Sequence, residues 1–187
     1  MSKYIIVEGL HSYSRDEKMF LKQWVNGNAF YTKVRNEYRE KRPNTILEKM
    51  FSTYDSKYKK DKPLYRGLSF NKTMSQEFEL YKKLRNSFMD AAEDKDEVVI
   101  DFAPASFTIK ESIANHFAKN IEKDYCSILF KVEQRITNEI DACSDKVGLK
   151  TIYQNEDEII LKSHKMIFTI LHLSEKNDKL EIILKEI

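Results

Sequence analysis

The C-terminal stretch Glu158–Ile187, EIILKSHKMIFTILHLSEKNDKLEIILKEI, decides the fold class of this 187-residue chain. Short apolar runs alternate in it with polar turns, which is typical of antiparallel strands. We expect strands at 158–161, 166–173 and 179–187, with turns at 162–165 and 174–178. Earlier apolar runs add expected strands at 64–70, 98–102 and 127–134.

The N-terminal third instead predicts helices. Residues 14–17, Ser-Arg-Asp-Glu, have the form of a capping box that opens a helix. Apolar residues then recur at spacings of three, four and seven: Phe20, Trp24, Tyr31, Val34 and Tyr38. Asn26-Gly27-Asn28 divides this stretch into two helices.

Three further helices are expected. Thr45-Ile46-Leu47-Glu48 has capping-box form and opens a helix through about residue 54. A second helix is expected at 75–92. A third is expected at 108–119, where Thr108 would cap through the box Thr108-Ile109-Lys110-Glu111.

Helices that precede most of the strands favour an α+β fold over repeated βαβ units. The length fits one domain covering 1–187, with a helical N-terminal part at 1–58 and a β-core at 59–187. Apolar residues make up 41% of the chain, enough for a sizeable core.

Composition excludes several functions. The formal net charge is only +2, so no global field calls for a nucleic acid or a membrane. The chain has four glycines and neither a GxGxxG nor a Walker motif, which excludes Rossmann and P-loop nucleotide binding. No apolar stretch approaches the roughly 20 residues that span a bilayer. We expect a cytoplasmic protein with reduced cysteines.

Three short segments carry chemistry. Leu64-Tyr65-Arg66-Gly67 begins an expected strand and carries a guanidinium, whose planar fork of donors suits phosphate oxygens. Ala105-Ser106-Phe107-Thr108 places two hydroxyl groups before an expected helix. Glu156-Asp157-Glu158 leads into an apolar strand, and residues two apart on a strand face the same side.

In this order, the three segments resemble the arginine-type R-S-E class of mono-ADP-ribosyltransferases, related to cholera toxin. They are especially similar to the Mod-type enzymes of T-even phages. The resemblance covers about residues 60 to 170 and implies helices packed on a split, mostly antiparallel β-sheet core. It also implies that the chain is an enzyme that consumes NAD, releases nicotinamide and needs no metal.

The resemblance assigns roles to individual residues. Glu158, Glu156 and Ser106 would be catalytic: Glu158 would contact the ribose, Glu156 would orient the acceptor, and Ser106 would hold Glu158. The NAD-binding residues would be Arg66, Gly67, Tyr65, Ser106, Phe107 and Thr108. Gly67 would let the backbone approach the nicotinamide amide. Phe107 stands where the family has a small polar residue, and it either packs or faces the nicotinamide ring.

The acceptor stays open at this stage. A glutamate at position 156 is typical of family members that modify arginine side chains of a target protein. The expected role is that of a phage effector or bacterial toxin. It would act in the infected host cell or the bacterial cell. The alternative is a base of RNA or DNA, as for a toxin with an antitoxin or inhibitor partner. Residues 33–66 hold eleven basic against five acidic residues, interleaved with aromatics, which motivates that alternative. A third hypothesis is a non-enzymatic binding module.

The remaining candidates have structural interpretations. The four histidines, His11, His116, His164 and His172, show no paired metal-ligand spacing, so no metal site is expected. Trp24 and the aromatic residues after it are interpreted as core and helix-packing residues.

Overall fold

The computed structural model describes residues 13–26, 28–53, 62–95, 97–137, 139–142, 158–162 and 165–187. Within them lie the helices α1 (Arg15–Asn26), α2 (Asn28–Arg39), α3 (Thr45–Thr53), α4 (Ser75–Asp94) and α5 (Glu111–Phe117). The strands are β1 (Leu64–Asn71), β2 (Glu97–Ile100), β3 (Ala105–Thr108), β4 (Tyr125–Gln134), β5 (Glu139–Asp141), β6 (Glu158–Leu161), β7 (Met166–Lys176) and β8 (Lys179–Glu186).

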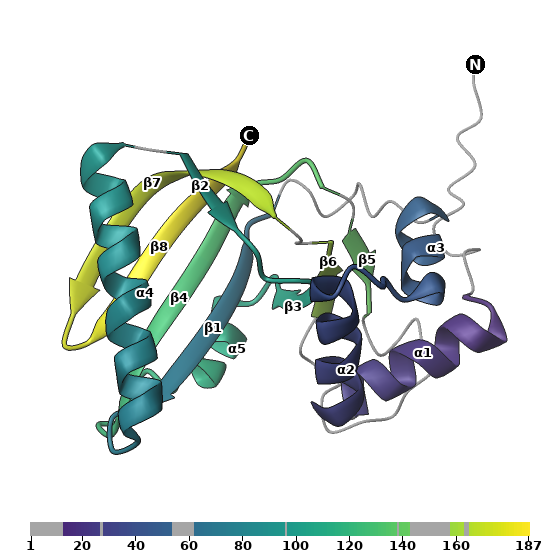
Figure 1. Ribbon diagram of the computed structural model, residues 1–187, viewed down its shortest axis with the longest axis horizontal. Coiled ribbons are helices and arrows are strands. Elements are labelled where there is room, and N and C mark those ends of the chain that lie inside the picture. Colours follow the sequence, from purple (N-terminus) through teal and green to yellow (C-terminus); the bar gives the residue numbers. More distant parts are fainter. Residues whose placement is uncertain are drawn as a thin grey trace.

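The strands form one sheet in the order β2-β7-β8-β4-β1-β3-β6-β5. Neighbouring strands are antiparallel except β4 and β8, which are parallel. β1 and β3 share a single registered pair, Tyr65 with Thr108. The sheet is therefore split into a five-strand half, β2-β7-β8-β4-β1, and a three-strand half, β3-β6-β5 (Figure 1). This confirms the expected α+β class with a mostly antiparallel sheet.

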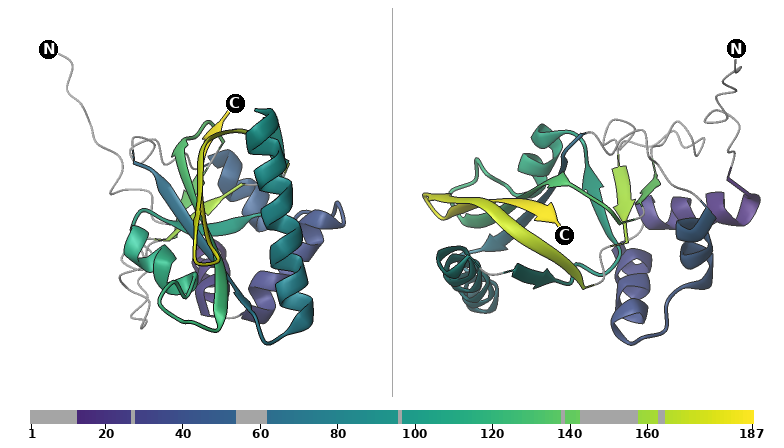
Figure 2. Two further views of the ribbon diagram at one scale, coloured as in Figure 1. Left: turned by 90° about the vertical axis from the view of Figure 1, so that its left-hand side faces the viewer. Right: turned by 90° about the horizontal axis from the view of Figure 1, so that it is seen from above.

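The five-strand half is covered by α4. Leu180, Ile182 and Leu184 alternate along β8 and are buried in the core, together with Tyr81 and Phe88 of α4. The helix α5 lies on the other side of the sheet from α4 (Figure 2). Because both faces near β1 are covered, that strand is held on two sides.

The three-strand half is covered by the N-terminal helices (Figure 1). Phe20 and Leu21 of α1 and Leu47 of α3 are buried in a second core that also contains Ile140 of β5 and Ile160 of β6. The helical stripe expected from the sequence supplies this core.

The capping box at the start of α1 is confirmed. The Ser14 amide donates to Glu17 Oε2 at 2.7 Å, and the Glu17 amide donates to Ser14 Oγ at 3.3 Å. The box expected at Thr45 is wrong, because the Asn44 side chain caps α3 and accepts from the amides of Ile46 and Leu47, both at 3.1 Å.

The helix expected at 108–119 also needs correction. Thr108 ends strand β3, where it pairs with Glu158, and α5 begins only at Glu111. The Thr108 hydroxyl accepts from the Lys110 amide at 3.0 Å, which is a local turn rather than a helix cap. Sheet pairing on both sides of β3 overrides the local capping signal. Ser106 and Thr108 are therefore strand residues.

Two smaller differences concern the strands. β7 continues to Lys176, and its turn to β8 is only Asn177 and Asp178, both with positive φ. β5 was not expected, because a three-residue strand leaves almost no periodic signal. No helix in the described ranges is long and apolar enough to cross a membrane.

Candidate active site

Strand alternation brings Ser106 and Glu158 to one face of the sheet. β3 and β6 pair antiparallel, with Ser106 opposite Ile160 and Thr108 opposite Glu158. The intervening residues, Phe107 and Ile159 among them, point into the core under α4. Since neighbours in a strand face opposite sides, Ser106 and Glu158 face the N-terminal helices.

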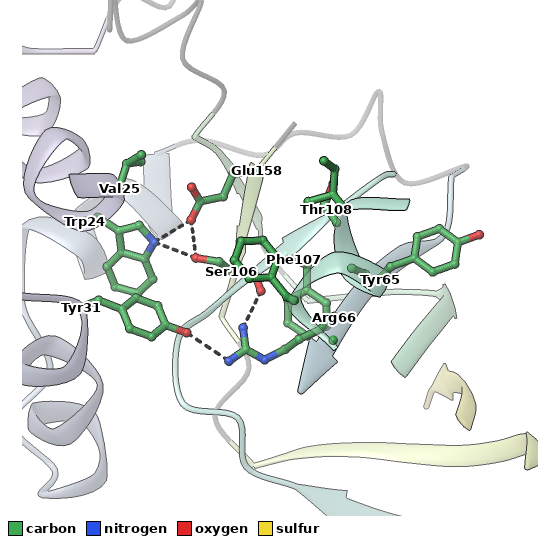
Figure 3. A pocket seen from close by; sticks show the side chains of 13 residues that line it. Trp24, Val25, Tyr31, Tyr65, Arg66, Ser106, Phe107, Thr108 and Glu158 are labelled. Carbon is green, nitrogen blue, oxygen red and sulfur yellow. Dashed lines mark hydrogen bonds between the residues drawn. The ribbon is translucent and has the colours of Figure 1, made fainter. Parts of the chain in front are cut away.

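On that face three side chains form one hydrogen-bonded cluster (Figure 3). The Ser106 hydroxyl donates to Glu158 Oε1. The Trp24 indole N–H of α1 lies between the two, 2.9 Å from Ser106 Oγ and 3.0 Å from Glu158 Oε1. The carboxylate is therefore fixed by two donors from two different elements.

Arg66 reaches the same region from β1. Its Nη1 donates to the Ser106 carbonyl oxygen at 2.6 Å, and its Nη2 donates to the Tyr31 hydroxyl at 3.2 Å (Figure 3). The guanidinium carbon lies 5.8 Å from the centre of the Phe107 ring. The Nε atom is buried and has no hydrogen-bond partner among the described residues. Each Nη atom carries a second N–H, and Arg66 lines the cavity described below.

A second guanidinium lies close by. Arg35 of α2 donates through Nε to the Phe102 carbonyl at 3.2 Å and lies 5.0 Å from the centre of the Tyr31 ring. Burial, together with the positive charge of Arg66, lowers the pKa of the Arg35 guanidinium. The site is therefore positively charged at Arg66 and Arg35, and the Glu158 carboxylate lies at its other end.

The cluster lines a cavity of about 300 Å³. All seven predicted NAD-contact and catalytic residues in the described ranges line it: Tyr65, Arg66, Gly67, Ser106, Phe107, Thr108 and Glu158. The side chain of Tyr65 extends away from the Ser106–Glu158 cluster (Figure 3). Glu156 lies outside the described residues.

The need for glycine at position 67 comes from packing. A Cβ atom there would lie 1.9 Å from the Ala114 carbonyl oxygen and 2.7 Å from the Ala118 amide nitrogen of the α5 segment. Glycine lets the backbones of β1 and α5 come into contact. This packing requirement is independent of the expected contact with nicotinamide. Phe107 is 2% exposed and packs edge-on against Phe102 at 5.5 Å, so packing is its observed role.

Trp24 and Tyr31 are site residues that were not predicted from the sequence. Both line the cavity, and each bonds to a predicted residue. Trp24 is a core residue as expected, 3% exposed, but its N–H is used at the site. A signal was available, because a buried indole N–H nearly always finds an acceptor. The sequence alone does not name that acceptor.

No family model and no curated protein matches the sequence. The fold does match solved structures. The ADP-ribosyltransferase HopU1 of Pseudomonas syringae pv. tomato is 14% identical, with a TM-score of 0.63 over 96% of this chain and 80% of that one. The Clostridium limosum C3 exoenzyme is also 14% identical, with a TM-score of 0.62 over 96% and 90%.

A third similar structure is C3stau2 from S. aureus, solved with NAD. It is 14% identical, with a TM-score of 0.56 over 100% of this chain and 98% of that one. At this level of identity the similarity establishes the fold. The chain has the fold of the ADP-ribosyltransferases, and its cavity lies where the two halves of the sheet meet α1 and α2.

Proposed function

We propose that this protein is an NAD-dependent mono-ADP-ribosyltransferase. The observation that carries the proposal is the convergence of Arg66, Ser106 and Glu158 around one cavity, from strands far apart in the sequence. The fold of the similar structures supports it, since those proteins are ADP-ribosyltransferases.

The cavity fits a dinucleotide with a positively charged nitrogen heterocycle. The Arg66 guanidinium lines the cavity and offers N–H donors to a phosphate oxygen, and Arg35 adds positive charge nearby. Tyr31 supplies aromatic surface. The structure of C3stau2 with NAD supports the same ligand for this fold.

The proposed reaction breaks the N-glycosidic bond of NAD. Nicotinamide leaves with the bonding electron pair, the ribose carbon becomes oxocarbenium-like, and an acceptor nitrogen forms the new bond and releases a proton. Glu158 would stabilise the positive charge. For unit charges 4 Å apart at an effective dielectric near 20, the Coulomb energy is about 4 kcal/mol. Ser106 would keep the carboxylate in place.

We further propose that the acceptor is an arginine side chain of a target protein. A guanidinium stays protonated at neutral pH, so a carboxylate must orient it and take its proton as the new bond forms. Glu156, two residues before Glu158, would do this. The sequence resemblance of the three segments to Mod-type phage enzymes is the reason for proposing a phage effector or bacterial toxin as the biological role.

A base of RNA or DNA is the alternative acceptor. It is motivated by the basic segment 33–66, in which Glu37 lies 3.9 Å from Lys33 and Glu40 pairs with Arg42 but basic residues stay in excess.

The test incubates the protein with NAD labelled in the adenosine part, a bacterial lysate and purified RNA. We expect nicotinamide release and label on protein, with Glu158→Gln as the inactive control. Absence of nicotinamide release by the wild-type protein overturns the proposal. Label that is removed by nuclease overturns the protein acceptor and leaves the NAD chemistry.

A second variant tests the role of Glu156. Glu156→Gln removes the proposed base while Glu158 remains. We expect it to abolish transfer to protein but to leave NAD hydrolysis near the wild-type rate. Equal loss of both activities contradicts this assignment.

A further inference from the structure

We propose that Trp24 is a positioning residue for Glu158: its indole N–H orients the carboxylate and stabilises the ionised form during NAD cleavage. The inference rests on the proposed function. It gives the helical N-terminal part a direct task at the site, in addition to covering the sheet.

The geometry gives Trp24 a specific contact with the carboxylate. The indole nitrogen lies 3.0 Å from Glu158 Oε1, the same oxygen that accepts from the Ser106 hydroxyl. It also lies 2.9 Å from Ser106 Oγ. Because the indole has only a donor, it favours the charged carboxylate and turns the Ser106 proton toward Glu158. Without the indole N–H, Glu158 Oε1 keeps the Ser106 hydroxyl as a donor.

The indole is itself held rigidly. Trp24 is 3% exposed, stacks on Phe20 with ring centres 6.0 Å apart, and meets Tyr31 edge-on at 4.7 Å. Tyr31 in turn accepts from Arg66. Neighbouring helices thus contact both ends of the site, Trp24 of α1 at the carboxylate and Tyr31 of α2 at the guanidinium.

Other titratable or charged side chains lie on the elements around Glu158. They are Arg66 on β1, Tyr31 and Arg35 on α2, and Asp141 on β5. These groups remain in a Trp24 variant. A change in the pH profile of such a variant is therefore assignable to the lost indole donor.

The first experiment removes the N–H of the Trp24 indole and keeps the shape of its ring system. The chain contains one tryptophan, so replacing tryptophan by β-(3-benzothienyl)alanine, in which sulfur stands for the N–H, changes position 24 alone. Trp24→Phe is the genetic counterpart. We expect kcat for nicotinamide release to fall about 10- to 100-fold, the effect of one hydrogen bond to a charged group. The acid limb of the pH profile should move to higher pH.

Phe20→Leu is the matched control. It loosens the packing of the indole but keeps its N–H, so it should lower the thermal midpoint without moving the acid limb. An acid limb that stays in place in both the sulfur analogue and Trp24→Phe overturns the inference, whatever happens to the rate.

A spectroscopic experiment separates failure of this inference from failure of the proposed function. The fluorescence of the single tryptophan should change with pH as Glu158 titrates, and Glu158→Gln should abolish that change. The measurement needs no activity, so it stands even if the protein does not cleave NAD. A titration curve that is identical in Glu158→Gln and wild-type protein overturns the Trp24–Glu158 coupling.

Discussion

The two halves of the sheet are built from similar strands but differ in what their covering helices do. In the five-strand half, α4 contributes Tyr81 and Phe88 to an apolar core, and its polar contacts lie at the rim. In the three-strand half, α1 also brings Trp24 to Glu158, and α2 brings Tyr31 to Arg66 of the neighbouring strand β1. An apolar helix face on a sheet thus gives support in one half and, in the other, one wall of a candidate active site at the boundary between the halves.

The difference follows from where polar residues stand in the strands. Leu180, Ile182 and Leu184 place only aliphatic groups beneath α4. Ser106 and Glu158 interrupt the apolar run on the face beneath α1. A half-buried carboxylate needs donors, and the covering helix α1 supplies one of them through Trp24.

The largest effect is expected from the buried ion pair beside the three-strand half. Arg135 Nε donates to Glu139 Oε2 at 2.8 Å, and both side chains are fully buried. Glu139→Ala leaves the buried guanidinium without that carboxylate and should lower the free energy of unfolding by about 3–5 kcal/mol. Chemical denaturation measures it. The control is Glu133→Ala in the five-strand half, whose ion pair with Lys131 is exposed and should contribute less than about 1 kcal/mol.

Gly67→Ala tests the close packing of α5 on β1, the strand at the boundary between the two halves. The new Cβ would collide with the backbone of the α5 segment, which cannot move aside as a flexible side chain could. We expect a loss of about 3 kcal/mol in unfolding free energy, at the upper end for overpacking. Ser69→Ala on the same strand is the control and should be nearly neutral. Full stability of Gly67→Ala would show that the glycine is not required by packing.

Glu158→Gln should separate activity from stability. We expect nicotinamide release to fall about 10²-fold or more, equal to about 2.7 kcal/mol of transition-state energy, with the thermal midpoint little changed. Glu175→Gln, in the five-strand half, is the control and should retain activity. Near-normal activity of Glu158→Gln would refute the role of this carboxylate.

The smallest effect concerns the rim of the five-strand half. Glu175 accepts from Arg85 Nε and Nη2, both at 2.6 Å, and these hydrogen bonds hold the pKa of Glu175 below its ordinary value of 4.5. The stabilisation is therefore fully present above that ordinary value and disappears as the pH falls through the lower folded-state pKa. Glu175→Gln should cost under about 1 kcal/mol at neutral pH.

That cost should disappear as the pH falls through the lowered folded-state pKa of Glu175, below which the carboxyl group of the wild-type protein is protonated as well. Denaturant midpoints of both proteins across this range measure the effect. A difference that is independent of pH would show that the ion pair is not its source.

Much of the architecture could be predicted from local pattern. The alternation in β4 and β8, the stripe of α1 and α2, and the capping box at Ser14 each depend on residues close together in the chain. Thr108 shows the limit of this approach, since its capping-box pattern was overridden by pairing with Glu158, fifty residues away. Asn44 was missed because Thr45, beside it, offered a competing cap.

The candidate site divides in the same way. The sequence by itself determined the fold class and the identity of Arg66, Ser106 and Glu158 as candidates, because motif and strand period are local properties. Only the tertiary structure decided that α1 and α2 reach these residues and that Trp24 donates to the carboxylate. The physical reason is that a buried donor and its acceptor can come from any two parts of a chain, and only packing selects the pair.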